Sequence, residues 1–422
     1  MASFSFGAGN AQKLVRIPLY ALGRLATLFI PRRPGAWAFG CGAGIGDGAL
    51  ALWELVADQG HTDAIWLTGS PREAADAAAR GIPSADKHSL QGFWRTARAG
   101  VVVVTHGFGD VNRYAVSGSF LVQLWHGIPL KRIGLDSPET VRSGILPGSR
   151  LVRTALATMY RGATRRIHVI PAASHLARGR LESAFALADD RVPVTGEPRV
   201  DVLSLGTEQE RRATARAMVA SLVGGIPNGA RLVLYAPTWR DGEADPAVPT
   251  AGEWAALVAT LERRDAVLLV RSHPLGAGEY APPIDTDRVR MLGSGILPDV
   301  TPVLPAIDVL VTDYSSLAFD AALVPLPVVY LAPDVAAYAA RRGFYGAYTD
   351  VAGPDYATAW PEATAQLDAV LGDEVVCAER TKRSVRLSAR VHAHRDGGNT
   401  RRVYRAIMSR AGAAAGLSKG AP

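Results

Sequence analysis

Several motifs that identify common classes of protein are missing from the 422 residues of this sequence. Its two cysteines, Cys41 and Cys377, lie far apart and form no C-x-x-C pair. This excludes a disulfide framework and a thiolate metal site, and it fits a reducing compartment such as the cytoplasm. The sequence also has no H-E-x-x-H, Walker A or G-x-S-x-G motif, which argues against a zinc protease, a P-loop kinase and an α/β-hydrolase.

The N-terminal segment 1–33 has no apolar run long enough to span a membrane, because Arg24 interrupts it short of the roughly 20 residues required. A signal peptide is disfavoured because its apolar region would contain Arg24. In a helix, one face would be polar, with Lys13, Arg16, Tyr20, Arg24 and Thr27, and another apolar, with Leu14, Ile17, Ala21, Leu25 and Leu28. We predict a basic amphipathic helix that lies either on an anionic membrane surface or on the protein itself.

The charge balance is mildly basic. The sequence has 46 Lys and Arg against 39 Asp and Glu, a formal net charge of +7. This favours polyanionic partners such as nucleotide phosphates, anionic lipids or a phosphate polymer. Nucleic acid is a weaker option, because no basic patch interleaved with aromatic residues stands out.

The composition and length indicate a globular protein of two domains, since 48% of the 422 residues are apolar and 20% are charged. Alternating strand and helix patterns occur twice, which predicts two doubly wound parallel sheets of the α/β class with a cleft between them. We place the first domain at residues 34–205 and the second at 206–377. Residues 378–422 are predicted to be a C-terminal helix and a disordered tail.

The central stretch of the sequence is Ile307–Asp320, I-D-V-L-V-T-D-Y-S-S-L-A-F-D. Its apolar run stops at two hydroxyl residues and then becomes helical, which predicts a strand, a tight turn and a helix start. Ser315 and Ser316 occupy the N-cap region, where hydroxyls and free backbone N–H groups favour an anion such as phosphate. Ser315 alone could simply cap the helix, so the neighbouring motifs decide between the two interpretations.

Three other predicted strands also end in polar residues. Phe120–His126 runs into Gly127, and Arg231–Thr238 runs into Trp239-Arg240-Asp241. Ala266–Val270 runs into Arg271-Ser272-His273. Ligands of open α/β sheets bind beyond the carboxyl ends of strands, so these ends suggest one cleft. A lone histidine at a strand end is more often structural, but His126 and His273 together could carry proton transfer and Arg271 could hold phosphate oxygens.

Two further motifs are weaker. The glycine-rich loop Cys41–Gly48 follows a short strand but does not match G-x-G-x-x-G, so it is either a close approach of the backbone to a ligand or only a tight turn. Asp285 and Asp287 form a D-x-D pair of the kind that can hold a divalent ion. Their place in a predicted loop favours a solvated turn, and we assign no metal ligands.

Five blocks, taken together, resemble the CDP-glycerol glycerophosphotransferase family of teichoic-acid and capsule synthesis. They occur in family order: W-H-G-I-P-L-K (125–131), T-G-E-P-R-V-D (195–201), Y-A-P-T-W-R-D (235–241), R-S-H-P (271–274) and T-D-Y-S-S-L-A-F-D (312–320). The resemblance implies a two-domain GT-B fold and transfer of glycerol phosphate, or a related polyol phosphate, from a CDP-linked donor to an acceptor hydroxyl with release of CMP. It also implies a lipid-linked or polymer acceptor and peripheral attachment to the cytoplasmic face of the membrane.

Site residues follow from the resemblance block by block. It implies that His126 is the general base and that His273 steadies the donor phosphates. Because Arg, backbone N–H groups and hydroxyls can neutralise the phosphates, we expect no metal or other cofactor. The implied donor contacts are Gly127, Ile128, Pro129, Leu130, Arg199, Pro237, Thr238, Arg271, Ser272, Ser315, Ser316 and Asp320.

The sequence departs from the family pattern at Ile128, where the family often has threonine, and at Ala318, where it has a second aromatic residue. We therefore expect the polyol pocket to differ from that of the family. The long additional domain of polymerising members is also missing, which favours a primase or short-chain transferase. Two alternatives remain: a GT-B glycosyltransferase or sugar 2-epimerase using a UDP-sugar, and a non-catalytic scaffold of polymer assembly. Release of CMP rather than UDP distinguishes the first, and turnover the second.

Overall fold

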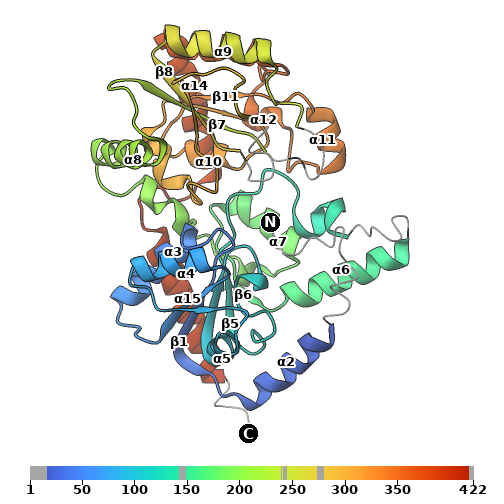
Figure 1. Ribbon diagram of the computed structural model, residues 1–422. Coiled ribbons are helices and arrows are strands. Elements are labelled where there is room, and N and C mark those ends of the chain that lie inside the picture. The colour runs from blue at the N-terminus through green and yellow to red at the C-terminus, as the bar shows by residue number, and fades with distance from the viewer. Residues whose placement is uncertain (1–16, 142–148, 239, 241–244, 273–279, 418–422) are drawn as a thin grey trace. The chain divides into compact units, whose positions relative to one another are not determined.

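The computed structural model describes residues 17–141, 149–238, 240, 245–272 and 280–417. The chain forms two compact units (Figure 1). Unit 1 comprises residues 1–126, 132–201 and 398–422, and unit 2 comprises residues 127–131 and 202–397. The change of unit after Asp201 lies close to the domain boundary predicted at residue 205.

Unit 1 contains a six-stranded parallel sheet in the order β3-β2-β1-β4-β5-β6. Its strands are β1 (Arg33–Phe39), β2 (Ala64–Thr68), β3 (Ser84–Asp86), β4 (Ala99–Val104), β5 (Phe120–Gln123) and β6 (Ile167–Val169). Its helices are α2 (Ile17–Phe29), α3 (Asp47–Asp58), α4 (Pro71–Ala79), α5 (Leu90–Arg98), α6 (Arg150–Thr164), α7 (His175–Phe185) and α15 (Asn399–Leu417).

Unit 2 contains a five-stranded parallel sheet in the order β11-β10-β7-β8-β9. Its strands are β7 (Arg231–Ala236), β8 (Ala266–Val270), β9 (Val289–Met291), β10 (Val309–Thr312) and β11 (Val328–Tyr330). Its helices are α8 (Glu208–Val223), α9 (Ala251–Arg263), α10 (Leu317–Ala321), α11 (Val335–Arg341), α12 (Thr349–Ala352), α13 (Trp360–Gly372) and α14 (Glu374–Val391).

Both sheets have the same topology. In each, the first strand (β1 or β7) lies beside the fourth (β4 or β10), and the strand order reverses direction between them. Ligands of open α/β sheets bind at this switch point, outside the carboxyl ends of the strands. The prediction of two doubly wound parallel sheets is confirmed.

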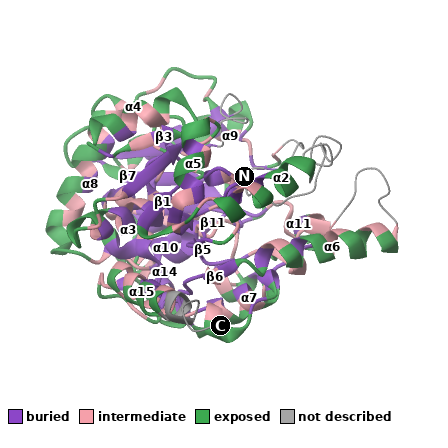
Figure 2. Cartoon of the chain, turned by 90° about the horizontal axis from the view of Figure 1, so that it is seen from below, coloured by how far each residue is buried: buried purple, intermediate pink, exposed green. Residues whose placement is uncertain are grey.

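The strands are buried and the helices expose their outer faces (Figure 2). In β4 the run Val101–Val104 is no more than 3% exposed, as expected for a parallel strand covered on both faces. Trp37, Phe39 and Trp66 stack in the core of unit 1. The ring centroid of Phe39 lies 5.8 Å from that of Trp37 and 6.1 Å from that of Trp66. A separate core in unit 2 is built around Trp254 and Tyr235.

The C-terminal segment belongs to both units. Helix α14 lies in unit 2, whereas α15 returns to unit 1, where Val403 and Ile407 are 0% exposed in its core. The start of α15 is fixed by Asp201, whose carboxylate accepts hydrogen bonds from the backbone N–H groups of Asn399 (3.0 Å) and Thr400 (2.7 Å). The helix extends to Leu417, so the predicted disordered tail is shorter than its composition suggested.

Helix α2 packs on unit 1 through its small and polar side. Gly23 and Thr27 are buried, and Tyr20 contacts Tyr114 with ring centroids 4.9 Å apart. Its apolar side faces outward instead: Leu22, Leu25, Leu28 and Phe29 are 61%, 52%, 74% and 80% exposed. No helix among the described residues is long and apolar enough to cross a membrane.

Candidate active site

His126 lies at the carboxyl edge of the unit 1 sheet, just after β5. The backbone there adopts an unusual turn, with φ of 64° at Trp125 and 131° at Gly127. A positive φ in a bulky residue such as Trp125 is strained, and such strain persists where the surrounding structure fixes the conformation. The turn presents the half-buried imidazole of His126 against the Trp125 ring, 4.2 Å away between centroids.

The imidazole of His126 is suited to accept a proton. Burial lowers its pKa well below the usual value, and the charge of Arg199, together with any proton taken up by His106, lowers it further, so the ring is neutral near pH 7. Its Nδ1 atom is buried and has no hydrogen-bond partner among the described residues. A neutral imidazole nitrogen can act as a general base if it comes within hydrogen-bond reach of a hydroxyl.

His106, which the sequence analysis did not assign to the site, lies directly against His126. It follows β4, the strand next to β5, and the two rings are parallel, with centroids 4.3 Å apart and an interplanar angle of 2°. The only sequence signal was its position after a predicted strand. To predict that the two rings are in contact, one would have needed the order of the strands in the sheet.

Arg199 also belongs to this edge of unit 1. Its Nε lies 3.7 Å from Oε2 of Glu197, and the two side chains are only 9% and 5% exposed. The start of α3 packs against its backbone, since a Cβ at Gly48 would lie 3.4 Å from Arg199 N. The sequence analysis predicted that Arg199 contacts the donor, and the structure places its charge near His126.

The glycine-rich loop and His106 together form the only group of possible metal-ligating atoms found among the described residues. Atoms of Cys41, Asp47 and His106 lie within 4.8 Å of one another. Burial raises the pKa of the Cys41 thiol well above its usual value, and Asp47 Oδ1 accepts a hydrogen bond from Gly48 N at 2.5 Å. A metal ion would have to displace the proton of this thiol on binding, and we assign no ion to this group.

In unit 2, the ends of β7, β8 and β10 bring together half of the predicted donor-binding residues. These neighbouring strands are followed by Pro237-Thr238, Arg271-Ser272 and Asp313–Ser316. The carboxylate of Asp313 joins two of the ends by accepting a hydrogen bond from Thr238 N at 2.9 Å. The hydroxyl oxygens of Thr238 and Ser272 are buried without a hydrogen-bond partner among the described residues.

The turn before α10 differs in detail from the predicted cap. Ser316 is the N-cap residue but its side chain makes no capping hydrogen bond. Ser315 makes it instead, with Oγ accepting from Leu317 N at 3.2 Å. Both serines remain partly exposed, whereas Asp320, which lies in α10, is 1% exposed.

Arg240 is the main residue of this edge that the sequence analysis missed. Its side chain, 4% exposed, forms ion pairs with Asp313 (2.9 Å) and Asp334 (2.8 Å). The guanidinium also lies over the rings of Tyr314 and Tyr338, at 4.9 and 5.1 Å from their centroids. Burial opposes its charge, but the hydrogen bonds with Asp334 and the charge of Asp313 outweigh burial and raise its pKa.

The segment Gly127–Lys131 belongs to unit 2, although His126 belongs to unit 1. Leu130 O accepts a hydrogen bond from Tyr345 N at 3.0 Å, and Lys131 pairs with Phe344 in an antiparallel bridge. Burial lowers the pKa of Lys131 to about 8, partly offset by Asp313, although some of its side chain stays exposed. Ile128, Pro129 and Leu130 are buried, as is Ala318, so both departures from the family pattern fall on buried positions.

Arg271 was predicted to hold phosphate oxygens, but its guanidinium binds backbone carbonyl oxygens of the protein instead. Its guanidinium donates to the carbonyl oxygens of Leu297 (2.7 Å) and Pro298 (2.8 Å), and so holds the loop that follows β9. Burial lowers its pKa to about 10. Its partner in the predicted motif, His273, lies outside the described residues.

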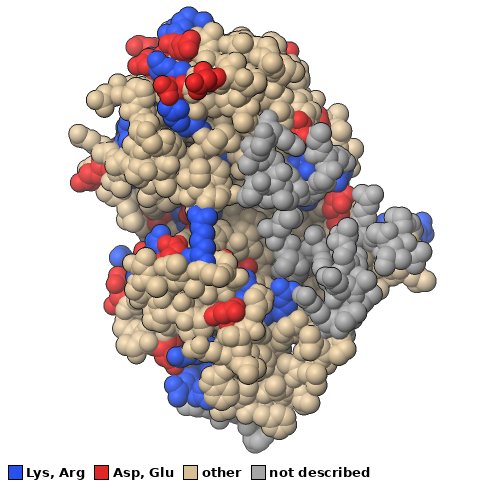
Figure 3. Space-filling view, viewed as in Figure 1, with Lys and Arg blue, Asp and Glu red and all other residues tan. Residues whose placement is uncertain are grey.

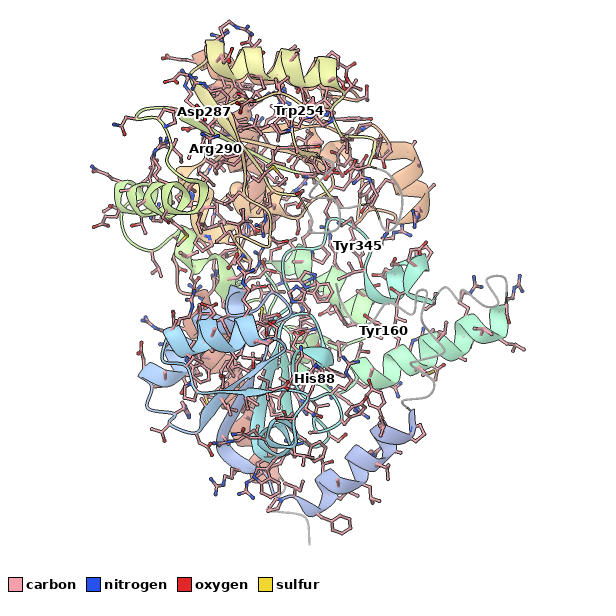
Figure 4. The ribbon with its side chains drawn as sticks, in the orientation of Figure 1. His88, Tyr160, Trp254, Asp287, Arg290 and Tyr345 are labelled. Atoms are coloured by element: carbon pink, nitrogen blue, oxygen red, sulfur yellow. The ribbon has the colours of Figure 1, made fainter. Side chains whose placement is uncertain are left out.

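The D-x-D pair has a local role. Asp287 is 91% exposed at its side chain and forms an ion pair with Arg290 at 2.6 Å, next to β9 (Figure 4). A neighbouring arginine neutralises the charge that a divalent ion would need, so this contact agrees with the solvated turn favoured by the sequence.

Comparison with solved structures identifies the class of fold. The chain superposes on the wall teichoic acid polymerase TagF with a TM-score of 0.75 and 21% identity, covering 95% of each chain. A putative UDP-N-acetylglucosamine 2-epimerase from Listeria monocytogenes matches less well, with a TM-score of 0.52 and 13% identity over 89% of this chain and 96% of that one. The fold is GT-B-like, with two parallel-sheet α/β domains.

The sequence model of the CDP-Glycerol:Poly(glycerophosphate) glycerophosphotransferase family matches residues 41–409. The chain therefore belongs to this family. A similar protein is the teichoic acid glycerol-phosphate transferase of Staphylococcus aureus (strain NCTC 8325 / PS 47), 27% identical over 330 residues, 76% of this chain and 80% of the relative. A teichoic acid poly(glycerol phosphate) polymerase of Staphylococcus epidermidis is 29% identical over 249 residues, 56% of this chain but 32% of the relative.

Proposed function

We propose that the protein transfers glycerol phosphate, or a related polyol phosphate, from a CDP-linked donor to an acceptor hydroxyl in the synthesis of a teichoic-acid or capsule-type polymer. The observation that carries this proposal is the position of His126 at the carboxyl edge of the unit 1 sheet, with a buried Nδ1 that lacks a partner among the described residues. Family membership supplies the reaction type. The test of this proposal must also identify the polyol, the acceptor and the number of units added.

In the proposed reaction, His126 takes the proton of the acceptor hydroxyl. The acceptor oxygen forms a bond to the phosphorus that carries the polyol, the bond from this phosphorus to the CMP oxygen breaks, and CMP leaves with the electron pair. Phosphoryl transfer needs mainly positioning and charge neutralisation. Lys131, Ser315, Ser316 and Thr238 supply an ammonium and hydroxyls for the donor phosphates, and the family resemblance adds His273.

We propose that the reaction needs no metal ion, because these cationic and hydroxyl groups can neutralise the diphosphate. The direct test incubates the full-length protein with labelled CDP-glycerol or CDP-ribitol and a lipid-linked acceptor, with and without EDTA. The expected result is CMP release and labelled product that survive EDTA. Loss of activity in EDTA with recovery in Mg²⁺ would require a metal. UDP release from UDP-sugars would favour a glycosyltransferase, and no turnover with any donor would favour a scaffold.

We also propose that unit 1 attaches the protein peripherally to the cytoplasmic face of the membrane. The exposed leucines of α2 support this, because a helix that packs on its own domain normally turns its apolar face inward. The surface over α2 is largely free of charged side chains (Figure 3). Helix α6 and its following turn add Arg150, Arg153, Arg161, Arg165 and Arg166, and Arg166 is close enough to Arg24 on α2 for the two charges to interact.

Flotation with liposomes tests this attachment. Replacing Leu22, Leu25 and Leu28 by glutamate should release the protein from anionic vesicles without changing its thermal midpoint, because these side chains are exposed in the folded unit. A matched control replaces Val375 and Val385, which are 78% and 46% exposed on α14 of unit 2. Equal loss of binding in the control, or none in the α2 variant, would contradict the proposal. Point changes are preferable to deleting residues 1–33, because Arg32 donates to four backbone carbonyls of unit 1.

A further inference from the structure

The stacked imidazoles of His106 and His126 are a feature that general base catalysis by one histidine does not require. The rings come from adjacent strands, β4 and β5, and lie parallel with centroids 4.3 Å apart. At this separation the two ring faces are in contact, so the orientation of one restricts the orientation of the other.

His106 is the more firmly held of the two. Its Nδ1 lies 2.8 Å from Thr105 Oγ1. The carboxylate of Asp110 accepts hydrogen bonds from the backbone N–H groups of Thr105 (2.9 Å), His106 (2.7 Å) and Gly107 (3.2 Å), which fixes the loop. On the other side, a Cβ at Gly42 would lie 2.5 Å from His106 Cγ, so the loop Cys41–Gly48 also confines the ring.

The charges around the pair favour one added proton over two. The titratable groups that face it are Cys41, Asp47, Asp110 and Arg199. Burial lowers the pKa of both imidazoles, and after burial the charge of His106 is the largest cause that lowers the pKa of His126. Two imidazolium rings in contact repel each other, so the pair titrates in separate steps.

We propose that His106 is a positioning residue for the base: its ring fixes the plane of the His126 imidazole, and the pair holds a single positive charge during the reaction. This inference rests on the proposed transfer of a polyol phosphate. The proton that leaves the acceptor hydroxyl goes to His126, whose ring becomes an imidazolium stacked on a neutral His106. His106 neither gives nor takes a proton in that step, and it does not contact the reacting atoms.

The pH profile of kcat/KM distinguishes this role from a merely structural one. In His106→Phe a flat ring remains but the titrating neighbour is lost, so the pKa of His126 rises and the acid limb of the profile moves up by about one pH unit. The maximal kcat should stay within about threefold of the wild type. In His106→Ala the same shift is expected, together with a fall in kcat of about tenfold or more at unchanged KM, because the ring plane is no longer fixed.

A matched control and an independent readout complete the test. His88→Ala removes an exposed histidine of unit 1 (labelled in Figure 4) and should leave the kinetics unchanged. Gly42→Ala keeps His106 but displaces its ring, and should reproduce part of the loss in kcat. Thermal unfolding of each variant shows whether it is folded.

Titration of the imidazole nitrogens by ¹⁵N NMR in the ligand-free protein needs no turnover. A higher pKa of His126 in His106→Phe is the expected result, and an unchanged pKa would overturn the inference. Wild-type kcat and pH profile in His106→Ala would overturn it as well. If the wild type shows no transfer at all, the proposed function fails while the NMR result still decides the role of the ring pair.

Discussion

The two sheets share a topology, yet their carboxyl edges carry different chemistry. The edge of unit 1 presents two neutral, stacked imidazoles, since burial lowers the pKa of both His106 and His126. The edge of unit 2 presents cationic groups, with Arg240 held by two aspartates and Lys131, which is charged below about pH 8, close to Asp313. A neutral imidazole keeps a lone pair for a proton, whereas the ammonium of Lys131 can attract anionic oxygens. The guanidinium of Arg240 is already paired with its two aspartates and holds this edge together. The comparison shows how one fold can separate base chemistry from phosphate binding.

The largest expected effect comes from removing the base of unit 1. His126→Ala should lower kcat by about 1,000-fold, within the range for loss of a general base, while the affinity for CDP-glycerol stays within about twofold. Steady-state CMP release and calorimetric titration of the donor measure the two quantities. His88→Ala is the control. A variant with full turnover would remove His126 from this role and erase the contrast between the edges.

The next effect concerns the ion pairs of unit 2. Arg240→Met leaves the carboxylates of Asp313 and Asp334 without their partner, and the free energy of unfolding should fall by about 3 kcal/mol, as expected when a buried pair loses one member. Arg288→Met, which breaks a pair with the 62% exposed Asp265, should cost less than about 1 kcal/mol. Urea unfolding measures both. Equal losses would show that the buried ion pairs of Arg240 stabilise the fold no more than an exposed pair does.

The serines before α10 test phosphate binding directly. Ser315→Ala combined with Ser316→Ala should weaken donor binding by about 2 kcal/mol, if each hydroxyl donates to an anionic oxygen. Because Ser315 also caps Leu317 N, a small loss of stability is expected in addition. Ser221→Ala, an exposed hydroxyl on α8, is the control. Unchanged donor affinity would limit the serines to capping.

The smallest effect is the pH dependence of the donor affinity. The pKa of Lys131 is lowered to about 8. Its side chain is therefore charged below this pH and loses its charge as the pH rises through it. Between pH 7 and pH 9 the affinity for CDP-glycerol should fall about threefold in the wild type. Lys131→Arg, which stays charged, should bind equally well at both values. The same decline in this variant would exclude Lys131 as its cause.

Much of the unit 2 edge followed from the sequence, because its residues are consecutive with recognisable strand ends. Thr238, Ser272 and Ser315 were predicted to meet, and the order β10-β7-β8 brings their strand ends together. Arg240 was not predicted, since its partner Asp334 lies 94 residues further along the chain. The same limit applies to His106, whose contact with His126 depends on the pairing of β4 with β5.

The sequence by itself determined the alternation of strands and helices, the hydroxyl-tipped turn at Ser315 and the position of His126 at a strand end, because these depend on local periodicity and turn chemistry. The tertiary structure decided which polar groups face one another. It stacked His106 on His126, returned α15 to unit 1 and turned the leucines of α2 outward. Such contacts join residues far apart in the chain, so strand order and packing determine them and local propensity does not.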